Sequence, residues 1–352
     1  MLNKVVIYRQ KTVIYGFGYI KDQLCYVTQD HNGFASEAVF NAKISKINHA
    51  EHSAFIDYSP GKTGFVNLAK GAKLQDGANL LVQLTWLGDE SKQAKFRRGV
   101  QLVGKYVVAA SSGISSADCS RASATQQRET LSQAMLAYPA KWTLRSSVKQ
   151  LADIEPVMLE IEHIGTQLNK LALLSSDNEV IAGVPNYLKL LRSLPLAQDC
   201  LISSNDKLVD EQLLYLQDCW LLDTIEYNPR LDMENELATY RELVASTSHN
   251  LSNGASLEIH CLSGINLIDV NSDQAKFSRS KLNFLVLDAI YQQICLRNLQ
   301  GIILLDLLKN MTNSEQEQVI EYLKKLFKHD ITNSKVLGFS HSGLCELIRQ
   351  KF

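Results

Sequence analysis

Two apolar stretches near the C-terminus decide the fold: GINLIDVNSD at 264–273 and ICLRNLQGIILLDLLKNM at 294–311. Each contains a short run rich in Ile, Leu and Val, which is typical of a buried strand. An Asp stands near the end of each run. A carboxylate in such a run is costly to bury unless it is paired or binds a cation. Because sites in α/β sheets gather at the carboxyl ends of strands, adjacent strands would bring Asp269 and Asp306 together. Such a pair is suited to a hard cation such as Mg²⁺.

Asn271 belongs to the same group, because it lies two residues beyond Asp269 and projects to the same face of an extended chain. From there it could contact a phosphate or an attacking water. The alternative is structural: each Asp caps a helix or pairs with a Lys. The spacing of the residues leaves both interpretations open.

The last third of the chain alternates strands with helices. Strands are predicted at 256–261, 264–270, 302–307 and 335–340, and helices at 280–299 and after the capping-box sequence at 314–317. Gly301 is the expected C-terminal cap of the first helix. This order predicts an α/β unit with a parallel component.

The first third is β-rich. Strands are predicted at 4–8, 12–17 and 23–28, and then at 38–47, 53–59, 63–68, 79–87 and 99–110. The last five have the size and spacing of a small closed barrel such as the OB fold, although a β-sandwich fragment would have a similar pattern. Phe55 and Phe65 flank a predicted hairpin. Exposed there, they would stack bases while Lys62 and Lys92 meet phosphates; the alternative is that both rings belong to the core.

The middle of the chain is mixed. A small, polar stretch at 111–125 marks a boundary, and further elements are predicted as helices at 126–136, 155–173, 185–193 and 209–219 and as a strand at 143–147. Arg145 is followed by Ser146, and an Arg fork beside a hydroxyl suits a terminal phosphate. The alternative is an ordinary surface arginine.

Composition limits the classes of protein. With 352 residues, 45% of them hydrophobic and 21% charged, the chain is globular and long enough for more than one domain. No apolar run has the ~18–20 residues of a membrane span, and no signal peptide is evident, so we expect a cytoplasmic protein. The seven scattered cysteines include no C-x-x-C pair, which argues against a disulfide framework or a zinc site within the chain. No P-loop, G-x-G-x-x-G or G-x-S-x-G motif is present.

Charge is distributed unevenly. Residues 1–110 carry 14 Lys and Arg against 8 Asp and Glu, whereas the remainder carries 22 against 29. This difference suggests phosphate binding early in the chain and carboxylate chemistry late, or else it is a chance fluctuation.

Taken together, these segments resemble the ribonuclease E/G family. The stretches at 264–273 and 294–311 look like the two-aspartate catalytic core of that family, and GFSHSGLCELIRQK at 338–351 looks like the segment beyond it. SAFIDYSPGKTGFVNL at 53–68 resembles the RNA-binding barrel hairpin. KWTLRSS at 141–147 stands where the family has its 5′-monophosphate sensor.

The resemblance implies a multi-subdomain α+β and α/β fold. The implied parts are an RNase H-like subdomain at 1–33 and 176–228, an inserted OB-type barrel at 34–108, a 5′-sensor-like segment at 109–175 and a DNase I-like catalytic subdomain at 229–352. It also implies a Mg²⁺-dependent endoribonuclease that cleaves single-stranded RNA with metal-activated water, in rRNA or mRNA processing or decay. The residues carried over by motif are Asp269 and Asp306 as metal ligands, Asn271 beside them, Phe55, Phe65 and Lys92 as RNA contacts, and Arg145 and Ser146 as the sensor.

The sequence also departs from the family pattern. Lys309 stands where a second acidic residue is usual, His341 replaces an Arg, the segment between the two Asp strands is a few residues short, and the turn at 252–254 is Ser-Asn-Gly. The sequence ends before the family's Cys-Pro-x-Cys zinc link, so we expect a monomer or a dimer rather than a zinc-linked tetramer. The alternatives to an enzyme are a non-catalytic RNA-binding protein of the same family and a scaffold without RNA affinity. Retention of Asp269, Asn271 and Asp306 favours catalysis.

Overall fold

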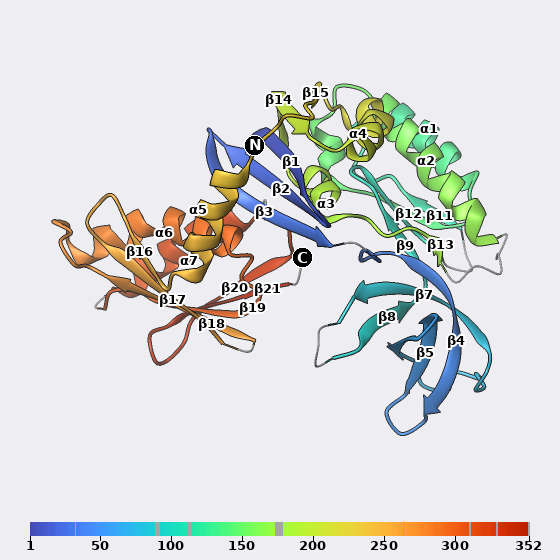
Figure 1. The fold of residues 1–352 in the computed structure, drawn as a ribbon, viewed down its shortest axis with the longest axis horizontal. Helices are drawn as coiled ribbons and strands as arrows, with labels where there is room; N and C mark the ends of the chain where they lie inside the picture. Colours follow the sequence, from blue (N-terminus) through green and yellow to red (C-terminus); the bar gives the residue numbers. More distant parts are fainter. Residues whose placement is uncertain are drawn as a thin grey trace. The chain divides into compact units, whose positions relative to one another are not determined.

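The computed structural model divides the chain into two compact units (Figure 1). The first comprises 1–29, 193–210 and 223–352, and the second comprises 30–192 and 211–222. The structure describes all residues except 32, 89–91, 112–114, 173–178, 263, 310, 329 and 351–352. Part of the predicted boundary at 111–125 therefore lies outside the described residues.

Mixed α/β structure is confirmed. The helices in the described residues are α1 (Thr125–Leu136), α2 (Glu155–Ala172), α3 (Asn186–Ser193), α4 (Lys207–Trp220), α5 (Glu234–Ala245), α6 (Arg279–Leu296) and α7 (Asn313–Phe327), with the 3₁₀ helix η1 (Ser146–Gln150). Every predicted helix is found within a few residues, and α5 is an addition. None of the described helices is long and apolar enough to span a membrane.

One sheet of the first unit joins segments that are far apart in sequence. Its strand order is β15 (Thr224–Tyr227), β14 (Leu196–Ser204), β1 (Leu2–Gln10), β2 (Val13–Ile20) and β3 (Gln23–His31). β1 pairs with β14 in parallel, so the chain leaves this sheet after β3 and returns to it with β14. The four-part division implied by the resemblance stays a prediction.

The other sheet of the first unit holds both aspartate strands. Its order is β16 (Ser248–Asn250), β17 (Ser256–Leu262), β18 (Ile265–Asn271), β19 (Gly301–Asp306), β21 (Cys345–Arg349) and β20 (Ser334–Phe339). β18 and β19 are parallel, as predicted. Side chains of one sheet face and of α6 and α7 form a single apolar core, which includes Ile268, Ile303, Leu305, Val286 and Leu323. The side chains on the opposite face of β17, β18 and β19 are mostly half-buried or exposed.

Two local predictions in this region are wrong. The capping box of α7 is Thr312 with Glu315, two residues earlier than predicted, because the Thr312 hydroxyl accepts from the Glu315 amide. α6 ends at Leu296, and Gly301 is not its cap but the first residue of β19. Gly301 has φ +84°, and a Cβ there would lie 2.8 Å from the Gly264 carbonyl oxygen, so the strand entry requires glycine.

The second unit contains a closed five-stranded barrel. Its strands pair in the order β4 (Val39–Asn48), β5 (Ser53–Ser59), β6 (Lys62–Asn67), β8 (Ala94–Arg98) and β7 (Asn79–Trp86), and β4–β7 pairing closes it. This order, with β6 and β8 parallel, is consistent with an OB-type barrel rather than a sandwich. β13 (Glu179–Ile181) adds to β4. Phe40, Ile56, Tyr58 and Phe96 fill the interior.

The fifth barrel strand differs from the prediction. It is β8, a short and largely charged segment, whereas the predicted strand at 99–110 splits into β9 (Gln101–Val103) and β10 (Val107–Ala110). These pair in a separate sheet of order β11 (Ser116–Asp118), β12 (Lys141–Leu144), β10 and β9, which packs on α1 and α2. Gly99, at φ +78°, lies at the exit of the barrel. The strand predicted at 143–147 ends at Leu144, and Arg145 caps η1 instead.

A buried ion pair fixes the end of the aspartate sheet. The Arg349 guanidinium donates to both carboxylate oxygens of Asp330, at 2.7 and 3.0 Å, and both side chains are fully buried. Its remaining terminal nitrogen donates to the Asn298 side chain and the Leu299 carbonyl, at 2.9 and 3.0 Å. β21 is thereby bound to the segment that leads from α6 into β19.

Arg349→Leu should destabilise the first unit by about 3–5 kcal/mol, because it leaves a buried carboxylate without its partner. Urea unfolding followed by circular dichroism should detect the shift. All three tryptophans, Trp86, Trp142 and Trp220, belong to the second unit, so their fluorescence transition should move less. Lys335→Ala, an exposed change in β20, is the control. Equal midpoints for Arg349→Leu and the unmutated protein would contradict this assignment.

Candidate functional site

The two predicted aspartates are register partners. Asp269 in β18 lies directly opposite Asp306 in β19, and in a parallel pair such partners project to the same face. Both are half-buried. Among the residues that the structure describes, neither carboxylate has an ion-pair partner. Two adjacent carboxylates repel each other, and a bound divalent cation would reduce this repulsion.

Asn271 completes the predicted group. Its side-chain amide donates to Asp269 Oδ2 at 3.2 Å, which holds one carboxylate oxygen in place. The structure therefore brings Asp269, Asn271 and Asp306 together on one face. Their roles stay predictions.

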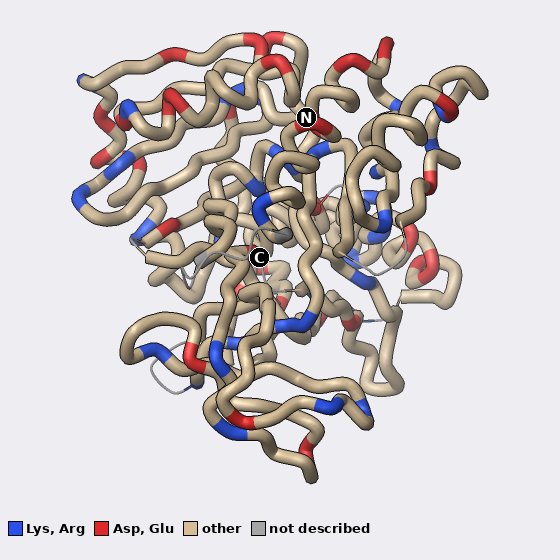
Figure 2. The backbone as a smooth tube through the Cα atoms, turned by 90° about the vertical axis from the view of Figure 1, so that its right-hand side faces the viewer, with Lys and Arg blue, Asp and Glu red and all other residues tan. Residues whose placement is uncertain are grey.

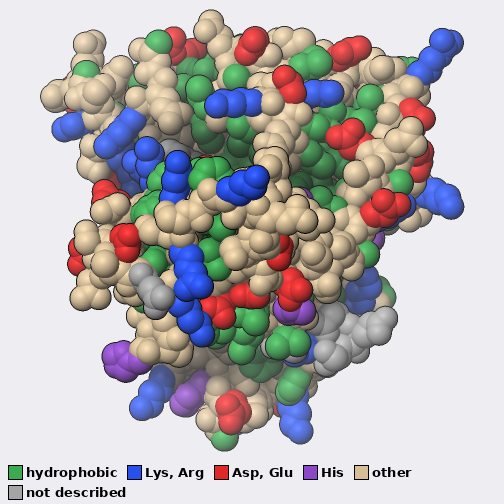
Figure 3. All heavy atoms as spheres, turned by 90° about the vertical axis from the view of Figure 1, so that its left-hand side faces the viewer, with side chains coloured by type: hydrophobic (Ala, Val, Ile, Leu, Met, Phe, Trp, Pro, Cys, Tyr) green, Lys and Arg blue, Asp and Glu red, His purple; other side chains and the backbone are tan. Residues whose placement is uncertain are grey.

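The same face carries further acids and an apolar row. Glu258 of β17 lies opposite Asp269, but it is exposed and its carboxylate is 3.7 Å from His260. Exposed aliphatic side chains pair in register across four strands, at Leu262, Ile265, Ile302 and Ile348. The space-filling view likewise shows hydrophobic side chains exposed beside acidic ones (Figure 3). These four side chains form an exposed apolar strip beside the acids.

A buried amide positions the segment that follows Asp306. The Asn283 side chain of α6 is fully buried; it donates to the Leu308 carbonyl and accepts from the Leu308 amide, each at 2.9 Å. These two bonds fix the backbone two residues beyond Asp306. Sequence analysis missed this residue, because Asn283 lies within an apolar helix pattern and its partner is a backbone group.

Two helix N-termini follow the aspartate strands. α6, capped by Ser278, follows β18, and α7, capped by Thr312, follows β19. The Ser280 hydroxyl of α6 donates to Glu315 of α7 at 2.5 Å, which joins the two ends. Helix N-termini attract anions, and the exposed Lys276 precedes α6. At this edge of the sheet, the α6 N-terminus and Lys276 favour an anion, whereas the Glu315 carboxylate already occupies the N-terminus of α7.

The barrel phenylalanines lie outside the barrel core. Phe55 is 38% exposed, Phe65 is half-buried and pairs with it across β5 and β6, and their ring centroids are 6.1 Å apart at 67°. The alternative that both belong to the core is therefore wrong. Lys92 is exposed just before β8. Lys and Arg positions recur along the barrel strands, with Asp and Glu positions among them (Figure 2).

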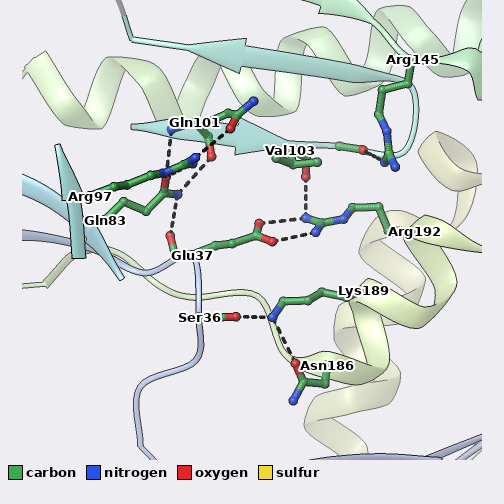
Figure 4. A network of polar contacts seen from close by, with 11 residues as sticks. Ser36, Glu37, Gln83, Arg97, Gln101, Val103, Arg145, Asn186, Lys189 and Arg192 are labelled. Atoms are coloured by element: carbon green, nitrogen blue, oxygen red, sulfur yellow. Dashed lines mark hydrogen bonds and ion pairs between the residues drawn. The ribbon is translucent and has the colours of Figure 1, made fainter. Parts of the chain in front are cut away.

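The predicted sensor arginine lies beside a second arginine. Arg145 and Arg192 donate to successive carbonyls, those of Gly104 and Val103, and so lie side by side (Figure 4). Arg192 also forms a two-pronged pair with Glu37, at 2.9 and 2.7 Å. Burial lowers the pKa of the Arg145 guanidinium, and the charge of Arg192 lowers that pKa further. No sequence pattern pointed to Arg192, because it belongs to α3, far from Arg145 along the chain.

The hydroxyl next to Arg145 is available at the surface. Ser146 is exposed, whereas Ser147 donates to the Lys105 carbonyl at 2.5 Å. The turn at 104–107 is held from below by Glu160, whose carboxylate accepts the amides of Lys105, Tyr106 and Val107. The surface around Arg145 is thus built on a backbone whose polar groups are already satisfied.

Comparison with known proteins identifies the C-terminal part. A model of the ribonuclease E/G family matches residues 224–352, the segment that contains both aspartate strands. This segment is a ribonuclease E/G family domain. The resemblance seen in the sequence is thereby confirmed.

Three relatives are similar to this chain at low identity. Ribonuclease E of Buchnera aphidicola (subsp. Acyrthosiphon pisum, strain APS) is 20% identical over 92% of this chain, and ribonuclease E of Escherichia coli (strain K12) is 21% identical over 89%. A chloroplastic ribonuclease E/G-like protein of Arabidopsis thaliana is 28% identical over 56% of the chain. The chain spans only 40%, 33% and 22% of the lengths of these three relatives, respectively.

Two of the departures noted in the sequence are single residues of this segment, Lys309 and His341. Lys309 and His341 are both exposed, so neither disturbs the packing around Asp306. In the described part of the chain, no group of three or more His, Cys, Asp or Glu side chains is arranged to hold a metal.

Asn283→Leu should lower the free energy of unfolding by about 1–3 kcal/mol, because the buried amide and carbonyl of Leu308 lose their partners. It should also speed hydrogen exchange at the Leu308 amide, which NMR measures directly. Asn235→Leu, at an exposed position in α5, is the matched control. An unchanged exchange rate at the Leu308 amide would show that the two Asn283 hydrogen bonds do not hold this segment.

Proposed function

We propose that this protein is a Mg²⁺-dependent endoribonuclease that hydrolyses phosphodiester bonds in single-stranded RNA. The observation that supports it most is the pairing of Asp269 with Asp306, in register and on one face, inside a ribonuclease E/G family domain. The relatives named ribonuclease E support the same reaction class.

The donor set fits Mg²⁺. This ion is commonly held by one or two carboxylates and keeps several waters, and Asp269 with Asp306 supplies two carboxylates without a competing cation. When bound, the ion would activate water and offset the charge that develops on the phosphate. Asn271 would orient Asp269 through its 3.2 Å hydrogen bond. Asn283 would hold the segment after Asp306 in place.

RNA binding is assigned to the barrel surface. Phe55 is exposed and Phe65 is half-buried beside it; both would stack unpaired bases, while Lys92 would meet a phosphate. Duplex RNA does not offer unstacked bases, so this surface favours single strands.

Asp269→Asn and Asp306→Asn should each lower cleavage of a single-stranded RNA by about 100-fold or more, since even outer partners of metal ligands contribute about 10–100-fold. The amide keeps an oxygen but loses the negative charge that Mg²⁺ needs. Cleavage of a 5′-monophosphorylated RNA, with and without Mg²⁺, measures the effect. Glu346→Gln, an acid on the same sheet face in β21, is the matched control.

Full activity in either Asp variant would refute the site. Absence of cleavage by the unmutated protein, together with tight RNA binding, would instead favour a non-catalytic RNA-binding protein.

Recognition of the 5′ end belongs to the same proposal. Arg145, half-buried and beside Arg192, should give 5′-monophosphorylated RNA a rate advantage of about three- to tenfold over 5′-hydroxyl RNA, less than a fully desolvated ion pair would give. Arg145→Ala should remove this advantage, with Ser146→Ala reducing it. Lys149→Ala, an exposed cation in η1, should leave it unchanged. Equal rates for both RNAs with the unmutated protein would rule out 5′ sensing.

Assembly and location are likewise proposals. We expect a cytoplasmic monomer or dimer without a zinc link. Sedimentation equilibrium with and without a strong zinc chelator distinguishes this state from a chelator-sensitive tetramer.

A further inference from the structure

On the barrel surface, the two phenylalanines lie between two lysines in a row across four strands. Phe55 pairs with Phe65 across β5 and β6, and Phe65 pairs with Lys95 across β6 and β8. On the other side, Lys46 of β4 pairs with Phe55. Lys46 and Lys95 are exposed, so the four side chains form one outward row of cation, ring, ring and cation.

The row ends at a basic hollow. A depression of about 570 Å³ lies where β6 and β8 separate, lined by Asn67, Ala69, Thr85, Lys95, Phe96, Arg97, Arg98 and Gly99. Its described lining therefore contains three cations and no acid. Lys95 belongs both to the row and to the hollow, which makes the two surfaces continuous.

Neutral groups hold one of these cations. The Arg97 side chain donates to the side-chain oxygens of Gln83 and Gln101, and no acid contacts it within the described part of the chain (Figure 4). Amide oxygens fix the direction of the guanidinium without cancelling its charge. The exposed Arg98 and Lys95 add mobile cations at the rim.

We infer that this hollow binds a backbone phosphodiester of the single-stranded RNA whose bases stack on Phe55 and Phe65. The inference rests on the proposed RNA function. The two surfaces suit different parts of a nucleotide. An aromatic ring stacks on a planar base, whereas cations without a neighbouring carboxylate bind the anionic linkage next to it. Because neighbouring strands are about 4.8 Å apart, the linkage lies within one or two nucleotides of the base on Phe65.

Lys95→Ala and Arg98→Ala should each weaken RNA binding several-fold, and the double variant by about tenfold or more. The double variant should also lower the slope of log affinity against log salt by about 0.7, since each phosphate contact on a single strand contributes about 0.7. Fluorescence anisotropy without divalent ions measures both quantities and separates binding from cleavage. Lys43→Ala, an exposed strand lysine opposite Asp57, is the matched control and should change neither.

A scan of neutral linkages locates the phosphate. In a short RNA with one methylphosphonate linkage moved along the strand, the unmutated protein should lose affinity at one position. The Lys95→Ala/Arg98→Ala variant should lose no further affinity there, while an abasic site one or two nucleotides away should remain costly. A structural defect would weaken binding at every position equally, so this coupling reports the contact itself.

The outcomes separate this inference from the proposed function. In one outcome, Phe55→Ala weakens RNA binding while Lys95→Ala/Arg98→Ala keeps the affinity and salt slope of the unmutated protein. In that case the phosphate site in the hollow is refuted, and the proposed RNA function stands. If the unmutated protein binds no RNA, both are wrong.

Discussion

The parallel register of β18 and β19 is the constraint on which the candidate active site depends. It places Asp269 opposite Asp306, and the apolar core on the other face fixes it. A slip by one residue would turn Ile268 and Ile303 toward solvent and the carboxylates into the core, so the register is strongly specified. The burial of one face against α6 and α7 thus determines what the opposite face can do chemically. Two like charges are kept adjacent by packing that they do not themselves stabilise.

Sequence reasoning reached this pair because its signal is local. Short apolar runs bounded by turns predict strands, and an Asp inside each run stands out against its neighbours. For Phe55 the decisive signal was also present: in SAFIDYS, alternation places Ala54, Ile56 and Tyr58 on one face and Phe55 with Asp57 on the other. Phe65 likewise alternates with buried Gly64 and Val66. The alternation of side chains between the two faces of the strand was better evidence of exposure than the general tendency of phenylalanine to be buried.

What the sequence did not reveal depends on contacts between distant residues. β8 was missed because AKFRR offers only Ala94 and Phe96 to the barrel core, too few for a recognisable alternation. β21 contains Arg349, which reads as a surface residue until Asp330 is seen beside it. Arg192 and Asn283 act through backbone carbonyls that no motif encodes. Arg349, Arg192 and Asn283 are thus polar groups whose partners only folding brings near.

The two cationic regions of the second unit differ in a way that suits two tasks. Arg145 is half-buried beside Arg192, where a lower effective dielectric strengthens each contact and makes an unsuitable ligand costly. Lys95 and Arg98 are exposed, so their attraction is weaker, is screened by salt and tolerates any sequence. A terminal phosphate occurs once per strand and must be distinguished from a hydroxyl, whereas backbone linkages recur at every nucleotide. Under the proposed function, this difference in burial would separate a site that discriminates one end of a strand from a surface that holds its length.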